Sequence, residues 1–315
     1  MSRTDVVKYS IIIPHHNIPE LLERCLKSIP VRDDVQTLVV DDLSDPQYQE
    51  PLHELEKKYP SVTFIFSQTN GGAGRARNIG MEHAVGHYLV FADADDFFSE
   101  EFDTILSDYS TQDYDVVYFR NISVLSDSIS TKDGRTSFID EIFDRYEKCG
   151  DASEIRCKIF NPWAKFFRKG LADEKHIRFD EIPCANDLFF VVSMGCEAEN
   201  IKVDKRVAYV YTDRPTSITA SVSRKPASLG IRADACFRAQ KVMKEHGFYF
   251  NFMPMSEFLS AMFHSDKQLF KKYLLKSKEA YRSRWEAIRQ VRGWEVGVAS
   301  KLWICIYSFS CILFK

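Results

Sequence analysis

The sequence lacks a strong net charge, C-x-x-C cysteine pairs and an apolar N-terminal segment. Its 42 lysines and arginines nearly balance 45 aspartates and glutamates, and a net charge of −3 is too small to attract nucleic acid. None of the eight cysteines belongs to a C-x-x-C pair, which disfavours a zinc site and a dithiol redox motif. Residues 1–8 are polar, unlike a secretory signal. We therefore expect a cytoplasmic protein with reduced cysteines and no nucleic-acid partner.

The first hundred residues alternate between the patterns of strands and of helices. Strands are predicted at residues 9–13, 35–40, 62–66 and 88–91, and helices between them at residues 21–29, 47–59 and 74–85. This alternation predicts an α/β fold, a mostly parallel, Rossmann-like sheet flanked by helices. Because the pattern turns helical after about Arg224, we expect one domain over residues 1–222 and a helical region over residues 223–315.

Polar clusters follow the end of each of these four strands. They are residues 14–17, Asp41-Asp42, residues 70–74 and residues 93–96. In sheets of this kind, ligands bind outside the carboxyl ends of the strands. The sequence therefore predicts that four separate loops converge on one crevice.

Asp93 and Asp95 stand two residues apart, directly after the fourth strand. Carboxylates in this position can share one hard divalent cation, Mn²⁺ or Mg²⁺, and leave places for phosphate oxygens. Alone, the pattern is also typical of a solvated acidic turn. Its place after an apolar strand and beside a glycine-rich helix start favours the metal site.

The glycine-rich turn at residues 70–74 is followed by Arg75 and Arg77. Glycines such as Gly72 let a backbone approach a phosphate, and a helix N-terminus offers free N–H groups. A plain turn and helix cap explain this segment equally well. Its spacing is neither G-x-G-x-x-G nor a Walker motif, which disfavours a nicotinamide or ATP site. Asp41 or Asp42 can accept a hydrogen bond from a base or a ribose, although an ordinary strand-end turn also explains the pair.

Taken together, these segments resemble the family 2 glycosyltransferases of the GT-A fold. The resemblance covers roughly residues 9–220 and rests on four segments in order: SIIIPHHN (10–17), VVDDLSD (39–45), NGGAGRARNIG (70–80) and FADADD (91–96). In the second segment, Leu43 stands where glycine is usual. The resemblance implies a GT-A sheet and a sugar transferase that uses a nucleoside-diphosphate sugar.

Three later segments resemble the family more weakly. Residues 162–166 look like an acceptor-side Trp-x-Lys element, and residues 211–219 look like the loop that closes over the donor. Residues 182–190 resemble the segment with a catalytic Glu-Asp pair. Asn186 replaces that glutamate, and Thr212 replaces the usual first arginine of the donor loop.

The resemblance implies a role for each matching residue. Asp187 would be the general base of a single displacement with inversion, with Asp180 or Glu181 in reserve. Asp93 and Asp95 would hold the metal. The donor side would comprise Pro14, Asn17, Asp41, Asp42, Gly72, Arg77, Asp93 and Arg214. The acceptor side would comprise Trp163 and Lys165, which a core tryptophan and a plain surface lysine explain as well.

The implied reaction moves a sugar, from a uridine-diphosphate sugar by preference, to a hydroxyl of a glycan or lipid-linked saccharide in cell-surface polysaccharide synthesis. A nucleotidyltransferase is one alternative, but it would carry a basic glycine-rich loop at residues 14–17. A non-catalytic GT-A module that binds nucleotide-sugar or glycan is another. The intact Asp93, Asp95 and Asp187 disfavour this second alternative.

Residues 302–314 form an almost wholly apolar tail. This tail is shorter than the ~20 residues that a membrane span needs. It is either a helix packed on the catalytic domain or an interfacial anchor that holds a cytoplasmic enzyme on the inner face of the membrane. The anchor would be assisted by the basic side chains of Lys267, Lys271, Lys272, Lys276 and Lys278.

Overall fold

A computed structural model describes residues 7–214, 226–249, 262 and 264–280 of this chain. The chain divides into two compact units, Met1–Ser217 and Ile218–Lys315, and each is described by itself. Three parts of the sequence-based predictions lie outside the described residues. They are the apolar tail at residues 302–314, the side chain of Lys278 and residues 215–219 of the donor loop.

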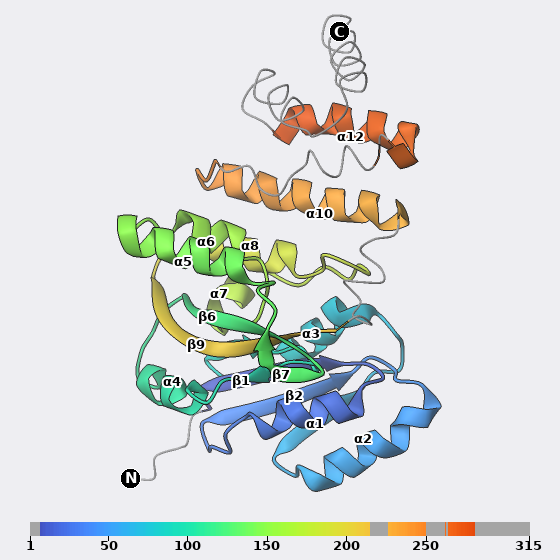
Figure 1. The fold of residues 1–315 in the computed structure, drawn as a ribbon, viewed down its shortest axis with the longest axis vertical. Helices are drawn as coiled ribbons and strands as arrows, with labels where there is room; N and C mark the ends of the chain where they lie inside the picture. Colours follow the sequence, from blue (N-terminus) through green and yellow to red (C-terminus); the bar gives the residue numbers. More distant parts are fainter. Residues whose placement is uncertain (1–6, 215–225, 250–261, 263, 281–315) are drawn as a thin grey trace, which may run out of the picture. The chain divides into compact units, whose positions relative to one another are not determined.

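The first half of the sheet in unit 1 is parallel. β1 (Tyr9–His15) lies between β2 (Val35–Asp41) and β4 (Tyr88–Phe91), and β3 (Val62–Phe66) pairs with β2. The neighbouring strands β1 and β2 are labelled in Figure 1. The connecting helices are α1 (Pro19–Lys27), α2 (Pro46–Lys58) and α3 (Gly72–His83). All seven residues of β1 are buried, as expected for a central strand covered on both faces. The predicted α/β fold is confirmed, and β3 and β4 have the predicted bounds.

Beyond β4 the sheet is mixed. β8 (Lys165–Arg168) runs antiparallel to both β4 and β6 (Val116–Leu125), and β6 runs parallel to β9 (Ile201–Asp213). Two short strands, β5 (Phe97–Phe98) and β7 (Ser128–Lys132), run antiparallel to β9 and β6 respectively. The first half of the sheet is therefore wholly parallel, whereas the second half combines the parallel pair β6–β9 with antiparallel pairs. Hydrophobic periodicity carries no information on strand direction, so the sequence does not predict this mixture.

The second half of unit 1 also contains five helices. They are α4 (Phe102–Tyr109), α5 (Ser137–Cys149), α6 (Ser153–Lys158), α7 (Lys169–Glu174) and α8 (Leu188–Glu197). Helices α5, α6 and α8 pack together (Figure 1). Gly195 of α8 allows this packing, since a Cβ there would collide with the carbonyl oxygen of Arg156 in α6.

Strand β1 continues through Pro14 to His15, two residues beyond the predicted end at residue 13. Proline cannot donate a backbone hydrogen bond and is normally excluded from central strands. It is tolerated here because the pairing of β1 with β4 ends at Ile12, so Pro14 pairs only with Val40 of β2. The strand therefore carries its polar end, His15, to the edge where the other loops begin.

Helix α3 packs closely on two neighbours because two of its residues have no side chain. A Cβ at Gly80 would collide with Ile12 of β1, and a Cβ at Gly74 would collide with the carbonyl oxygen of Asp180. The second contact brings the segment that leads into α8 against the start of α3. This close approach places residues distant in sequence at one edge of the sheet.

In unit 2, α10 (Pro226–Glu245) contacts α12 (Lys267–Ala280). The hydroxyl of Tyr273 donates to the carbonyl oxygen of Gly230 at 2.8 Å and to Asp234 at 2.6 Å. Lys276 also pairs with Asp234, whereas Lys267, Lys271 and Lys272 are exposed. Within the described ranges, no helix has the length and apolar character needed to cross a membrane.

Candidate functional site

Three aspartates follow β4, and one of them fastens the loop. Asp96 is buried; its Oδ1 accepts from the backbone N–H of Thr212 at 2.6 Å and its Oδ2 from the hydroxyl of Tyr209 at 2.9 Å. Burial, together with the charges of Asp95 and Asp93, raises the pKa of Asp96 well above its usual range. Asp96 therefore ties the loop to β9, and Asp93 and Asp95 remain as the pair for an ion.

Asp93 and Asp95 are each held by one arginine. Asp93 Oδ1 accepts from Arg77 Nη2 at 2.6 Å, and Asp95 Oδ2 accepts from Arg214 Nε at 2.7 Å. Burial and the neighbouring charge of Asp93 raise the pKa of Asp95, opposed by Arg214. This crowding of negative charge is what a divalent cation would relieve, so the donor set fits a hard metal.

Arg77 bridges the aspartate loop to the segment before α8. Its guanidinium is buried over the ring of Phe179 at 5.3 Å, and Nη1 donates to Asn186 Oδ1 at 2.9 Å while Nη2 holds Asp93. The resemblance implies that this arginine sits by the nucleotide or diphosphate. In the structure, both terminal nitrogens of the guanidinium donate hydrogen bonds within the protein, so Arg77 joins Asp93 to the neighbour of Asp187.

Asp187 is the N-cap residue of α8 and is partly buried. Burial raises the pKa of its carboxyl; Arg77 opposes this rise, Asp93 adds to it and Lys165 opposes it. No side chain among the described residues donates a hydrogen bond to this carboxylate. The reserve candidates differ: Glu181 is exposed and accepts from Asn78 at 3.3 Å, and the backbone N–H of Asp180 donates to the carbonyl oxygen of Asn186 at 3.0 Å.

The interpretation of Lys165 as a plain surface lysine is wrong. Its side chain is buried, with 2% of the residue exposed, and Nζ donates to the carbonyl oxygens of Asn161 at 2.7 Å and Trp163 at 3.4 Å. Burial lowers the pKa of Lys165 to about 7, and the charge of Asp187 opposes this shift. Lys165 is the first residue of β8, which lies between β4 and β6 in the sheet.

Trp163 is buried against two aromatic rings of β9. Its ring stacks on Tyr209 with centroids 5.1 Å apart and planes at 10°, and on Tyr211 at 5.8 Å and 29°. Tyr209 in turn accepts from the backbone N–H of Asp93 at 2.9 Å. Trp163 thus supports the strand that fixes the aspartate loop, and its own ring presents little surface to solvent.

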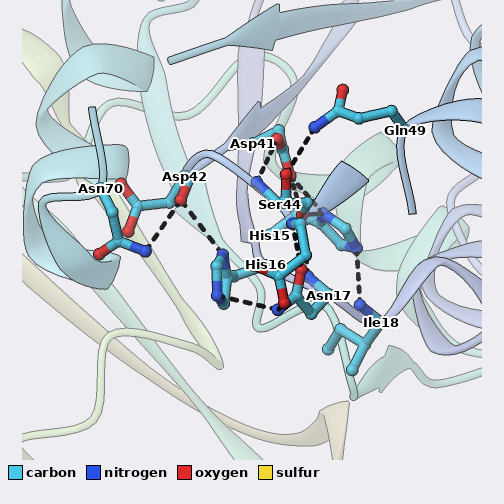
Figure 2. Close-up of polar contacts among 10 residues, drawn as sticks. His15, His16, Asn17, Ile18, Asp41, Asp42, Ser44, Gln49 and Asn70 are labelled. Carbon is cyan, nitrogen blue, oxygen red and sulfur yellow. Dashed lines mark hydrogen bonds and ion pairs between the residues drawn. The ribbon is translucent and has the colours of Figure 1, made fainter. Parts of the chain in front are cut away.

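The acidic pair after β2 is engaged within the protein (Figure 2). Asp41 Oδ1 lies 2.8 Å from Nδ1 of His15, and Oδ2 accepts from the backbone N–H of Ser44 at 2.9 Å. Burial raises the pKa of Asp41, but hydrogen bonds from His15 and Ser44 outweigh it and lower the pKa. The two histidines face different partners, since His16 Nδ1 lies 3.1 Å from the carbonyl oxygen of Asp42.

The side chain of Asp42 binds the start of α3, where the sequence leaves open a phosphate site or a plain turn and helix cap. Its Oδ1 accepts from the backbone N–H of Gly71 at 2.8 Å and its Oδ2 from that of Gly72 at 2.7 Å. Gly72 has a φ of 81°, which glycine adopts without strain. The two N–H groups that would receive an anion are therefore already bound to a carboxylate of the protein.

Asn17 joins the loop after β1 to the loop after β2. Its backbone N–H donates to Ser44 Oγ at 2.9 Å, and its side chain exchanges hydrogen bonds with Asp45 at 2.7 and 2.9 Å. Asn17 has a φ of 60°, a left-handed conformation that asparagine tolerates better than most residues. Pro14 is buried within β1, three residues before Asn17.

Left-handed backbone marks other parts of the site. Leu43 (φ 57°) follows the acidic pair, Ala164 (φ 56°) separates Trp163 from Lys165, and Ala185 (φ 56°) precedes Asn186. Such strain concentrates at functional sites. The left-handed conformation of Leu43 also gives a physical reason why glycine is usual at this position in the family.

Sequence reasoning missed Arg24. This residue lies on α1, and its Nη2 donates to the carbonyl oxygen of Asp95 and to Thr212 Oγ1, the latter at 3.2 Å. The guanidinium also lies over the ring of Phe97 at 5.4 Å. No sequence signal identified it, because a basic residue on an amphipathic helix is usually solvated.

Comparisons with known proteins bear on the family and the fold of this chain. The family model described as "Glycosyl transferase family 2" matches residues 10–174. The chain is 28% identical to the "Uncharacterized glycosyltransferase EpsJ" of Bacillus subtilis over 69% of this chain and 64% of EpsJ. It is 25% identical to the "Poly(ribitol-phosphate) beta-glucosyltransferase" of Bacillus spizizenii over 70% of this chain and 34% of that protein. The chain thus spans less than two thirds of these curated relatives.

Two solved structures share the fold. Staphylococcus aureus TarS 1-349 in complex with UDP-GlcNAc matches with a TM-score of 0.60 and 21% identity, over 90% of this chain and 81% of that one. The mannosyltransferase PcManGT from Pyrobaculum calidifontis, in complex with GDP-Man and Mn²⁺, matches with a TM-score of 0.53 and 16% identity, over 98% and 81%. The GT-A fold that the resemblance implies is confirmed. Since the family match spans more than half of the sequence and contains β1, the aspartate loop and β8, this chain belongs to glycosyl transferase family 2.

Proposed function

We propose that this chain transfers a sugar from a nucleoside-diphosphate sugar to a hydroxyl of a glycan or lipid-linked saccharide, with inversion at the anomeric carbon. The observation that carries the proposal is the bridge made by Arg77. It links Asp93, at the end of β4, to Asn186, the residue before Asp187. A pair of metal-type carboxylates and a candidate base, about 90 residues apart in sequence, therefore share one site.

Asp93 and Asp95 are the residues that would hold Mn²⁺ or Mg²⁺. Across the described residues, no group of three or more His, Cys, Asp or Glu side chains could hold a metal ion. Two carboxylates leave coordination places open, which suits an ion that takes its remaining ligands from donor phosphates and water. Such an ion would act as a Lewis acid that stabilises the charge of the departing nucleoside diphosphate.

Asp187 would take the proton of the acceptor hydroxyl as that oxygen attacks the anomeric carbon. A carboxylate with a raised pKa is a stronger base than an ordinary one, which suits this role. Arg77 and Lys165 oppose the rise and thereby favour the charged, proton-accepting form. Direct attack by the acceptor, with no covalent sugar intermediate on the enzyme, gives inversion.

The donor side would be shaped by Pro14, Asn17, Asp41, Asp42 and Gly72. Because both oxygens of Asp41 and of Asp42 accept hydrogen bonds from the protein, these carboxylates would act first by fixing the loops around the nucleotide base. Arg214 is the cationic candidate for the diphosphate. A uridine-diphosphate sugar is the favoured donor, supported by the fold shared with TarS in complex with UDP-GlcNAc.

The acceptor would be a polymer or lipid-linked saccharide of the cell surface, made on the cytoplasmic side of the membrane. The relatives support this class, since one is named as a poly(ribitol-phosphate) glucosyltransferase and another as a teichoic acid poly(glycerol phosphate) polymerase. Trp163 and Lys165 would act on the acceptor side through the shape of the loop that they hold. Tail residues 302–314 remain the candidate contact with the membrane.

Hydrolysis of a panel of nucleotide-sugars, with and without Mn²⁺, tests the proposal. We expect Mn²⁺-dependent release of sugar and nucleoside diphosphate by the wild type, loss of this release in Asp95→Asn, and normal release in Asp108→Asn, which lies on α4 beside Arg206. Release of inorganic diphosphate from a nucleoside triphosphate and a sugar phosphate, supplied in place of the nucleotide-sugars, would indicate a nucleotidyltransferase instead. Nucleotide-sugar binding without any turnover, even with saccharide acceptors added, would indicate the non-catalytic module.

A further inference from the structure

The two arginines that hold the metal-type carboxylates are anchored very differently. The side chain of Arg77 is 5% exposed and has a second anchor on Asn186. The side chain of Arg214 is 19% exposed, and its bond to Asp95 is the one hydrogen bond that it makes within the described part of the chain. Arg214 also stands immediately after the last residue of β9. The Arg77–Asp93 pair is therefore held by a second contact, whereas the Arg214–Asp95 pair can separate.

The Arg214 contact occupies a position that an ion would need. Arg214 Nε donates to Asp95 Oδ2 at 2.7 Å, and the side chain of Asp95 is 20% exposed. A partly buried carboxylate beside the like charge of Asp93 needs a cation nearby, since burial of uncompensated charge is unfavourable. In the absence of a metal, the guanidinium supplies that positive charge. A metal and the guanidinium would then compete for the same carboxylate.

We propose that Arg214 is a positioning residue for metal loading, an internal cation that holds Asp95 until a divalent ion takes over this carboxylate. The released guanidinium is then free, beside the ion, to contact the phosphates of the donor. This inference rests on the proposed function, because it takes Asp93 and Asp95 as the metal ligands. It adds an order of events: the ion displaces an arginine of the protein, and that arginine joins the donor site.

The inference predicts that one substitution has opposite effects on two binding reactions. In Arg214→Gln the competitor for Asp95 is gone, so Mn²⁺ alone should bind about three- to tenfold more tightly, as expected when a partly buried ion pair no longer has to be broken. With Mn²⁺ saturating, UDP should bind about tenfold more weakly, because a charge-assisted contact to phosphate is lost. If Arg214 had a merely structural role, the substitution would weaken both Mn²⁺ binding and UDP binding.

Mn²⁺ binding to the full chain can be followed by the electron paramagnetic resonance signal of the free ion, and UDP binding by calorimetry. The matched control is Arg206→Gln. Arg206 lies on β9 and has a partly exposed side chain, but it pairs with Asp204 at 2.7 Å and Asp108 at 2.6 Å, outside the site. The Arg206→Gln substitution removes one positive charge, as Arg214→Gln does, so it reports how far the loss of a charge by itself changes Mn²⁺ and UDP binding. Asp95→Asn reports whether the ion uses the proposed ligand.

Tighter Mn²⁺ binding in Arg214→Gln than in Arg206→Gln, with weaker UDP binding, is the expected result. Unchanged or weaker Mn²⁺ binding in Arg214→Gln would overturn the inference, and so would an equal gain in Arg206→Gln. If the inference is overturned in this way but Asp95→Asn still loses Mn²⁺ binding, the proposed metal site stands and only the displacement of Arg214 by the ion is wrong. If Asp95→Asn binds Mn²⁺ like the wild type, or if no protein binds it even with UDP, the proposed metal site and the inference both fail.

Discussion

Lys165 offers a direct test of how the interior of this site is built. It is buried at the start of β8, and its ammonium donates to two carbonyl oxygens, those of Asn161 and Trp163. Lys165→Met keeps the length of the side chain but cannot titrate. The substitution leaves both carbonyl oxygens without this donor, at a cost of about 1–3 kcal/mol each that does not vary with pH. Any change with pH therefore reports the buried charge.

The size of that change follows from the pKa. Burial lowers the pKa of Lys165 from 10.5 to about 7, and each unit corresponds to about 1.4 kcal/mol. Between these values the unfolded chain keeps the proton on Lys165 and the folded chain has released it. Because the unfolded state then binds more protons, the stability of the wild type rises with pH, by up to about 1.4 kcal/mol per unit. Below pH 7 both states are protonated and the rise ends.

We expect the free energy of unfolding of Lys165→Met to fall relative to the wild type by about 3 kcal/mol between pH 7 and 9.5. Urea denaturation at several pH values measures this difference, and other titrating groups cancel because both proteins contain them. Lys205→Met, at an exposed position of β9, controls for the loss of a positive charge. A difference between Lys165→Met and wild type that is constant with pH would refute a desolvated ammonium at this site.

Three further predictions concern the reaction and the loops. Asp187→Asn should lower turnover by about 10²–10⁴-fold with donor affinity nearly unchanged, and the product should show an inverted anomeric centre by NMR; normal turnover here with a loss in Asp180→Asn would move the base to the reserve candidate. Excess chelator should abolish turnover, and so should Asp95→Ala. The circular dichroism and melting temperature of Asp95→Ala should stay those of a folded protein. Full activity in excess chelator or in Asp95→Ala would contradict the metal role. Leu43→Gly should change stability by less than about 1 kcal/mol in urea denaturation, because relief of left-handed strain offsets the added freedom of the unfolded chain and Leu43 is 45% exposed; a larger loss would show that its side chain packs.

The sequence predicts the first half of the fold well because each element there is local. The apolar runs of β3 and β4 are bounded by turn residues, and their predicted limits agree with the structure. The sequence does not predict β8, because its first two residues belong to the segment that resembles a Trp-x-Lys element and its four residues form a strand only by pairing with β4 and β6. The second half of the sheet depends on pairing between segments that are distant in sequence, and hydrophobic periodicity does not encode the direction of that pairing.

The same distinction applies to the site. Strand-end position predicts that polar residues gather at one edge, and the contacts among Asp93, Arg77 and Asn186 agree with this expectation. It does not predict which of these side chains are buried and engaged. Lys165 reads as a surface residue because lysine usually is one, and Arg24 reads as a solvated helix residue for the same reason. Only the three-dimensional neighbours of each side chain reveal its role.

The aspartates that follow β2 and β4 have two different roles, one in fixing loops and one in holding a guanidinium. Asp42 and Asp96 give both oxygens to backbone N–H or hydroxyl donors of a neighbouring segment, so neither can change partner without opening a loop. Asp93 and Asp95 each hold a guanidinium at the end of a long side chain. A guanidinium can leave by rotation about side-chain bonds, while a backbone N–H cannot. The proposed exchange of a protein cation for a metal ion therefore belongs to Asp95, because the arginine on Asp93, Arg77, is also anchored on Asn186. Asp42 and Asp96 would keep the loops in place during that exchange.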